Sequence, residues 1–220
     1  MIWLDHSKEM PEGKHALFSG SVYGWTDIKI EDDEEFEEKI RQLYFNSFAT
    51  QVGTLIHHFA ANRLKYRARL TKSHSKDLFI HLAENYIPEN VAAYYTNRCF
   101  INTLNYVNDS IALRLDPEVR LYCYPDINGT TDAIRYVPKE MLRIHDLKSG
   151  TSKVSLRQLE TYAAFCCIEY HINPLELPLI ELRIYQNEDV LIGNPTGEDL
   201  IPLMKHIERV EGAIEKVKRD

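Results

Sequence analysis

The segment 143–150, RIHDLKSG, places an acid and a lysine two residues apart at the end of what its apolar pattern predicts to be a buried strand. Residues i and i+2 of a strand share a face, so Asp146 and Lys148 should project side by side while Leu147 turns into the core. The pair is then either a salt-bridged strand end or half of a metal-dependent catalytic centre. Three other acid-x-Lys triplets occur in the chain, so the spacing alone does not decide.

A second carboxylate, Asp132, is expected beside Asp146. If the strands on either side of the turn at 138–139 pair antiparallel, position 132 lies opposite 145 or 146. Two adjacent carboxylates repel each other, so the arrangement is stable mainly with a cation between them. Hard ions such as Mg²⁺ prefer oxygen ligands, and Lys148 beside them could orient a water or stabilise negative charge developing on a phosphate.

The elements that would position these residues follow from hydrophobic periodicity and turn signals. Helices are predicted over 33–47, 50–70, 76–86, 89–113, 153–172 and 197–218. Strands are predicted over 118–125, 128–137, 140–149, 177–188 and 189–194. Ser155 is the candidate cap of the fifth helix. This order predicts an α/β fold with a mixed sheet.

The length of 220 residues is typical of one domain with a helical elaboration. The net charge of −7 is unusual for a nucleic-acid binder, but seven of the 33 acids lie in 31–38, where acids favour a helix start. The rest of the chain is balanced and could carry a basic groove. The alternative for 31–38 is an acidic mimic or a partner-binding tail.

No apolar run approaches 18 residues, and the first residues lack the pattern of a signal peptide, so we expect a cytoplasmic protein with no membrane partner. The four cysteines contain no Cys-x-x-Cys pair and are expected to be free, mostly buried thiols. They are Cys99, Cys123, Cys166 and Cys167.

Four motifs occur in chain order, GTLIHHFA, GTTDAI, IHDLKSG and RQLETYAAF, and together they span residues 53–162. The pattern resembles the RecB-like branch of the PD-(D/E)xK nuclease superfamily, which includes small phage exonucleases and CRISPR adaptation nucleases. The matching residues are Gly53 and His57, Asp132, Asp146 and Lys148, and Gln158 and Tyr162. The resemblance implies a restriction-endonuclease-like core, in which 33–113 is the helical elaboration, 114–194 the core sheet with its helix, and 197–218 a closing helix.

The resemblance also implies roles for individual residues. His57, Asp132, Asp146 and the backbone carbonyl of Leu147 would hold Mg²⁺ or Mn²⁺, and Lys148 would act on the nucleophilic water or on the transition-state charge. Gln158 and Tyr162, four apart on one helix face, would brace the catalytic site and the nearby DNA backbone. Some relatives hold an iron–sulfur cluster, but the cysteine spacing here does not match theirs, so none is expected.

Each of these residues also has a purely structural interpretation. His57 is a semi-buried histidine in that case, Asp132 a turn acid, and Tyr162 a core residue. Glu118, just before the first core strand, is either a surface acid or a supporting acid of the site. His58 is expected at the surface, and His145 should face away from Asp146 in a structural role.

The favoured hypothesis is a metal-dependent deoxyribonuclease, most simply an exonuclease acting on DNA ends in phage or mobile-element recombination or repair. Lys153, Arg157, Gln158 and Tyr162, with the basic run 63–72, would contact the DNA backbone. A single-strand annealing or single-strand-binding protein would be a natural partner in a bacterial or phage-infected cell. The alternatives are a catalytically inactive DNA-binding or interaction module on the same fold, another metal hydrolase, and a structural α/β protein.

Overall fold

The computed structural model describes residues 24–219, and its contacts divide the chain into two compact units after Phe48. In the first unit, helix α1 (Asp33–Ser47) begins where the acidic block predicts. Asp32 caps it, because its Oδ1 accepts the backbone N–H of Glu35 at 2.9 Å. Predictions for the segment before residue 24 lie outside the described residues, and the assignment of the whole chain to one domain stays a prediction.

The second unit contains a five-stranded sheet in the order β1-β2-β3-β4-β5. Its strands are β1 (Asp116–Tyr124), β2 (Ile127–Val137), β3 (Met141–Leu147), β4 (Leu179–Gln186) and β5 (Asp189–Gly193). Strands β1, β2 and β3 form an antiparallel meander, β3 and β4 are parallel, and β4 and β5 are antiparallel. The predicted mixed sheet is therefore confirmed.

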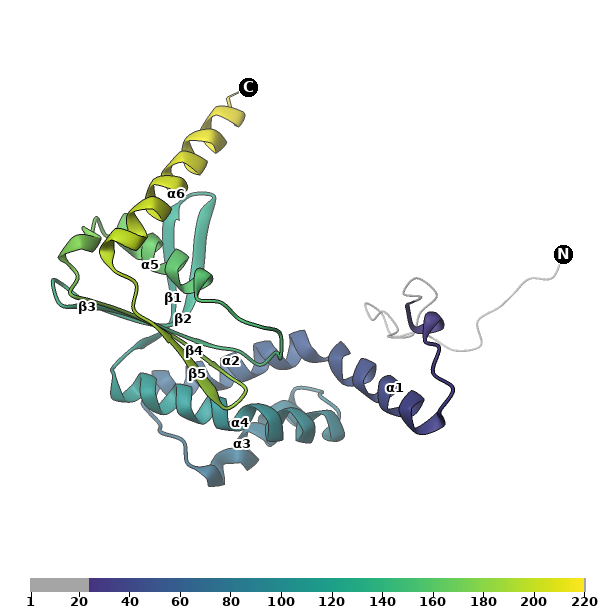
Figure 1. Ribbon diagram of the computed structural model, residues 1–220. Helices are drawn as coiled ribbons and strands as arrows, with labels where there is room; N and C mark the ends of the chain where they lie inside the picture. The colour runs from purple at the N-terminus through teal and green to yellow at the C-terminus, as the bar shows by residue number, and fades with distance from the viewer. Residues whose placement is uncertain (1–23, 220) are drawn as a thin grey trace. The chain divides into compact units, whose positions relative to one another are not determined.

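Helices flank both faces of this sheet (Figure 1). One face carries α2 (Ala49–Lys65), α3 (Ser75–Glu84) and α4 (Glu89–Ala112), and the other carries α5 (Arg157–Glu169) and α6 (Gly197–Val217). The crossover from β3 to β4 runs through α5, as a parallel pair requires. Among residues 24–219, no helix combines the length and apolar character needed to cross a membrane.

The main core lies between the sheet and the α5 and α6 side. Leu142 and Ile144 of β3 and Leu182 of β4 are fully buried against Leu159 and Ala163 of α5. Because β3 is central and covered by helices on both faces, nearly all its residues are buried, including the polar His145 and Asp146. Two polar side chains held this deeply are rigidly positioned.

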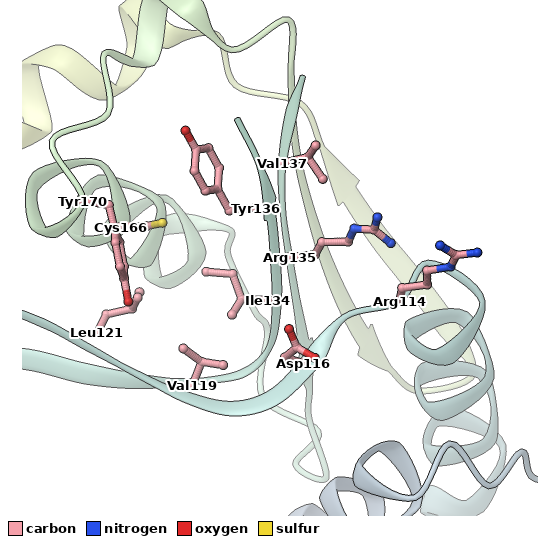
Figure 2. Close-up of a pocket in the computed structure, with 10 residues that line it drawn as sticks. All are labelled: Arg114, Asp116, Val119, Leu121, Ile134, Arg135, Tyr136, Val137, Cys166 and Tyr170. Carbon is pink, nitrogen blue, oxygen red and sulfur yellow. The ribbon is translucent and has the colours of Figure 1, made fainter. Parts of the chain in front are cut away.

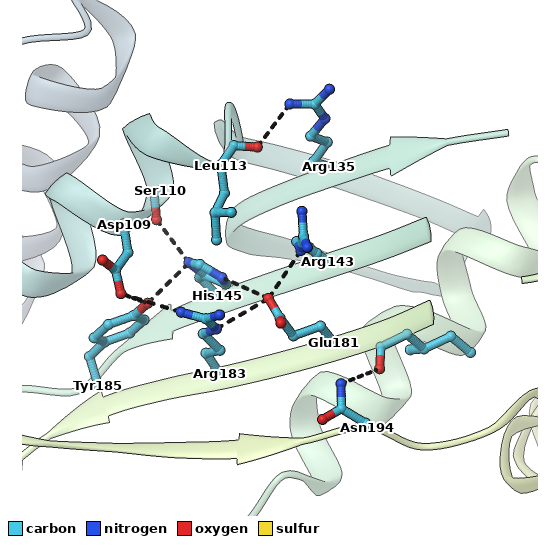
Figure 3. Close-up of polar contacts among 11 residues, drawn as sticks. Asp109, Ser110, Leu113, Arg135, Arg143, His145, Glu181, Arg183, Tyr185 and Asn194 are labelled. Atoms are coloured by element: carbon cyan, nitrogen blue, oxygen red, sulfur yellow. Dashed lines mark hydrogen bonds and ion pairs between the residues drawn. The ribbon is translucent and has the colours of Figure 1, made fainter. Parts of the chain in front are cut away.

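The face of β3 that carries His145 meets α4 through a buried polar network (Figure 3). Nδ1 of His145 lies 3.1 Å from Ser110 Oγ and 3.4 Å from the Tyr185 hydroxyl, which donates to Asp109 Oδ2 at 2.9 Å. His145 therefore faces away from its neighbour Asp146, as the sequence predicts.

Glu181 of β4 is the carboxylate of this network. The His145 ring, with Nε2 at 3.9 Å from Glu181 Oε1, acts with Arg183 and Arg143 to lower the pKa of Glu181 to about 2. Because 3.9 Å exceeds a hydrogen-bond distance, the direct contacts are those of the guanidinium groups, at 3.2 Å from Arg183 and 3.1 Å from Arg143. The network fixes the register of β3 against β4 and α4.

Two helix boundaries differ from the prediction. The helix expected over 50–70 ends at Lys65, and Arg67 has a left-handed φ of 52° just beyond it. The helix expected from 153 begins at Arg157, with Leu156 at the cap position and no capping side chain, so the assignment of Ser155 as the cap is wrong. In the loop before α5, the carbonyls of Gly150 and Ser152 accept hydrogen bonds from the side chain of Gln186 of β4.

Candidate metal centre

Three carboxylates form a row across the first three strands. The β1–β2 ladder pairs Pro117 with Ala133 and Val119 with Thr131, which places Glu118 opposite Asp132. The β2–β3 ladder pairs Ala133 with His145, which places Asp132 opposite Asp146 one step further on. Residues opposite each other across antiparallel strands share a face, and like charges there repel.

Helix α2 brings His57 to this row. Its Nδ1 lies 3.2 Å from Asp132 Oδ1, with both side chains partly buried. One turn earlier, Gly53 faces the loop after β3 so closely that a Cβ at 53 would lie 3.0 Å from Ser149 Oγ. The glycine lets α2 approach the end of β3.

His57, Glu118 and Asp132 offer a metal-binding set. One ligand atom from each residue lies within 4.8 Å of the other two, and all three line a cavity of about 460 Å³. No hydrogen bond or ion pair joins the Glu118 carboxylate to another residue of the described range 24–219. Glu118 also has a left-handed φ of 52°, a conformation that is costly for a residue with a Cβ.

Asp132 is held in place from two sides. While its Oδ1 faces His57, its Oδ2 accepts the backbone N–H of Leu147 at 2.8 Å. Leu147 is 1% exposed and turned into the core, as expected. The coordination of an ion by the carbonyl of Leu147 stays a prediction.

A continuous hydrogen-bond chain links the other four candidate residues. Lys148 Nζ donates to Asp146 Oδ1 at 3.1 Å and to Gln158 Oε1 at 2.9 Å, and Gln158 Nε2 donates to the Tyr162 hydroxyl at 3.1 Å. Gln158 and Tyr162 lie one turn apart on α5 and so share a face. An ammonium group has three N–H donors, so one donor of Lys148 remains for a phosphate oxygen or a water.

The electrostatics of the site show an excess of negative charge. Burial and the neighbouring Asp132 raise the pKa of Asp146 to about 6, although Lys148 opposes the rise. Burial, followed by the charge of Asp132, also raises the pKa of Glu118. Burial alone would lower the pKa of His57, but its hydrogen bond to Asp132 and the surrounding carboxylates outweigh burial and raise it.

This donor set fits a hard divalent cation. Carboxylate oxygens suit Mg²⁺ and Mn²⁺, and one imidazole is compatible with Mn²⁺ in particular. Glu118 has no partner within the described range, and a cation would relieve its repulsion with Asp132. Binding of a cation would therefore stabilise this group of side chains.

The structure brings most of the predicted residues together, and it adds one. The metal set includes Glu118, which the sequence suggested only as a supporting acid, while Asp146 adjoins it through Asp132. Lys153 and Arg157 are exposed, and Arg157 pairs with Glu160 on its own helix at 3.4 Å, so their DNA contacts stay predictions.

Other predictions around the site hold. His58 is exposed, as expected, and its ring stacks on that of His81. All four cysteines are free thiols, and three of them, Cys99, Cys166 and Cys167, are buried.

A comparison of the chain with protein-family models, curated proteins and solved structures finds no significant match. The motifs and the geometry of the site are therefore the observations that bear on function.

Proposed function

We propose that the chain is a divalent-metal-dependent deoxyribonuclease with a PD-(D/E)xK active site of the RecB-like kind. The observation that carries the proposal is the convergence of two systems at one sheet face. The His57–Glu118–Asp132 set meets the Asp146–Lys148–Gln158–Tyr162 chain where Asp132 and Asp146 stand opposite each other. A salt-bridged strand end would need only Asp146 and Lys148.

His57, Asp132 and Asp146 would hold the cation, together with Glu118. When bound, such a cation supplies Lewis-acid polarisation of the phosphate oxygens and a more acidic attacking water. The N–H of Leu147 and the ring of His57 hold the Asp132 carboxylate before substrate arrives, so little reorganisation of this ligand is needed.

Lys148 is placed to act on the reacting phosphate. Asp146 and Gln158 each accept one of its N–H groups, which orients the ammonium and leaves a donor for the water or for the negative charge that develops on phosphate. Tyr162 in turn receives a hydrogen bond from the amide of Gln158 and so holds that side chain in its orientation. Phosphodiester hydrolysis requires that the reacting groups are held in one geometry, and here Gln158, one of the side chains that position Lys148, is itself hydrogen-bonded.

An exonuclease acting on DNA ends is the form of this activity that we favour, on a restriction-endonuclease-like core. The motif pattern resembles that of small stand-alone nucleases, and the motif residues occur in the expected order on α2, on β2, at the end of β3 and on the crossover helix α5. A recombination or repair setting, with a single-strand annealing protein as partner, belongs to the same proposal.

Cleavage assays on end-labelled linear DNA and closed circular DNA, with Mg²⁺ or Mn²⁺, test the proposal. We expect metal-dependent loss of the linear DNA and no nicking of the circle. The Lys148→Ala protein should be inactive, whereas Lys205→Ala, which removes a lysine from α6, should retain wild-type activity.

The other outcomes are equally informative. Nicked circles would make the protein an endonuclease with the same site. Binding of DNA without cleavage would favour a catalytically inactive module. Absence of both cleavage and Mn²⁺ binding would refute the metal-site interpretation.

A further inference from the structure

A second cavity, of about 480 Å³, lies between the start of β1, the end of β2 and helix α5 (Figure 2). Its size is within the range of small-ligand pockets. Figure 2 shows the guanidinium groups of Arg114 and Arg135 on one side of β2 and the rings of Tyr136 and Tyr170 on the other. None of these four residues belongs to the metal centre.

Within residues 24–219, no ion pair joins Arg114 or Arg135 of this cavity to a carboxylate. Asp116 also lines the cavity, but its carboxylate pairs with Arg67 at 3.1 Å. Arg135 donates one N–H to the carbonyl of Leu113 at 2.9 Å, which brings its guanidinium next to residue 114. Arg114 has no side-chain hydrogen bond or ion pair with any residue from 24 to 219, and its φ is left-handed at 59°. Two guanidinium groups in one cavity favour an anion.

On the side of the tyrosine rings, the cavity is apolar and aromatic. Val119, Leu121 and Ile134 form the floor, and the ring of Tyr170 is 55% exposed at the margin. Aromatic rings beside a positively charged groove are the means by which proteins hold unpaired nucleic-acid bases, because every base has a face that stacks. Arginine side chains on one side of β2 and aromatic rings on the other thus border one cavity.

The cavity adjoins the metal centre along both strands. Asp116 lines it two residues before Glu118 on β1, and Ile134 lines it two residues after Asp132 on β2. Two residues of a β-strand span about 7 Å, which is close enough for one nucleic-acid strand to reach from the first cavity to the second.

We propose that this cavity holds one unpaired nucleotide of the substrate, next to the phosphate that is cleaved. Arg114 and Arg135 bind its phosphate, and Tyr136 and Tyr170 contact its base. The inference rests on the proposed nuclease activity and specifies its substrate as a single strand or a frayed end, since a paired base cannot enter the cavity.

Binding measurements in the Lys148→Ala protein with Mg²⁺ test the proposal without cleavage. The probe is a fluorescein-labelled twelve-residue oligothymidylate, followed by fluorescence anisotropy. Replacing Arg114 and Arg135 with alanine should raise the Kd about tenfold or more. It should also reduce the slope of log Kd against log salt by about 0.7, the value for one phosphate of a single strand that is no longer neutralised.

Arg120→Ala is the matched control. Arg120 also belongs to β1 and is exposed, but it alternates with the cavity residues Val119 and Leu121, and its guanidinium bonds Asn128 and lies over Tyr122. The control should leave the Kd within about twofold. Blunt duplex DNA should be bound with little change by every variant.

Tyr136→Leu separates base contact from phosphate contact. It should weaken binding of oligothymidylate about tenfold, in line with the loss of one stacked base, and leave binding of an abasic oligomer of equal length unchanged. Circular dichroism melting curves identify any variant that fails to fold.

Three results would overturn the inference. They are an unchanged Kd in the double arginine variant, an equal loss in Arg120→Ala, and an equal loss of affinity for duplex and single strand. If the wild-type chain cleaves DNA while the variants bind normally, only the nucleotide cavity is refuted. If the wild-type chain shows no metal-dependent cleavage, the proposed function fails first.

Discussion

Gly129 of β2 lies against the edge of the Tyr162 ring of α5. A Cβ at position 129 would lie only 2.6 Å from Cε1 of Tyr162, well inside van der Waals contact. The missing side chain therefore lets the ring lie flat enough for its hydroxyl to meet Gln158. A glycine within β2 thus determines where a site residue of the crossover helix can lie.

Gly129→Ala should displace the Tyr162 ring and weaken DNA cleavage by about tenfold to a hundredfold, since a displacement near 1 Å can have that effect. The fold should persist, because a side chain and not the backbone is displaced. Steady-state cleavage rates and thermal melting measure the two effects. Gly150→Ala is the control, since its added Cβ meets no atom within 4 Å, and equal rates for the two variants would contradict the prediction.

Gln158→Leu should lower kcat about tenfold or more with little change in KM. The substitution keeps most of the volume but removes the acceptor that orients the ammonium of Lys148. Thr161→Val on the same helix removes a hydroxyl that bonds only the carbonyl of Arg157, and it should be nearly neutral. A change in KM alone would show that Gln158 contacts DNA and does not position Lys148.

Glu118→Gln should leave the melting temperature of the metal-free protein unchanged or slightly higher. The carboxylate has no partner within the described range and stands opposite Asp132, so removing its charge relieves repulsion. The rise in melting temperature on adding Mn²⁺ should become smaller, because a ligand has been lost.

Differential scanning calorimetry with EDTA and with Mn²⁺ measures both quantities for Glu118→Gln. The exposed Glu140, in the β2–β3 turn, provides the control Glu140→Gln, which should respond to Mn²⁺ as the wild type does. A full Mn²⁺ response in Glu118→Gln would exclude Glu118 from the ligand set.

Glu181→Gln should lower stability near neutral pH by about 1–3 kcal/mol, because the two guanidinium groups lose a charged acceptor. The pKa of Glu181 is lowered from 4.5 to about 2, so its ionised form stabilises the fold above pH 4.5 and that contribution fades as the pH falls toward 2. The difference between wild type and variant should therefore shrink below pH 4.5.

Urea denaturation between pH 7 and pH 3 measures this difference for Glu181→Gln. The same series with Glu140→Gln should show a small difference at every pH. A difference for Glu181→Gln that stays constant across the range would contradict the lowered pKa.

Much of the fold could be predicted because the local signals are strong. The alternation of β1 and β2, the turn at Pro138-Lys139 and the helical period of α5 give the strand order and the crossover. Counting residues outward from that turn predicted that Asp132 lies opposite position 145 or 146, and the pairing of Ala133 with His145 leaves Asp146 opposite Asp132. Since an antiparallel ladder has a fixed register, this count needs no tertiary information.

The sequence suggested Glu118 only as a surface acid or a supporting acid, and not as a member of the candidate metal-binding set. Its position depends on a left-handed backbone at residue 118, and φ at a single non-glycine residue is set by tertiary contacts. Ser155 has a side chain suited to a cap, but the helix begins at Arg157 with Leu156 at the cap position. The chain just before it, at Gly150 and Ser152, is bonded to Gln186 of β4, a contact distant in sequence that local preference does not predict.

The irregular start of β1 has a further consequence for aggregation. β1 is an edge strand, and exposed edges can pair with strands of other molecules. A strand added there would meet Pro117, which has no N–H, the left-handed Glu118, and a shift of register between Tyr122 and Tyr124. The distortion that aims a carboxylate at the metal centre therefore also protects the sheet from edge-to-edge association.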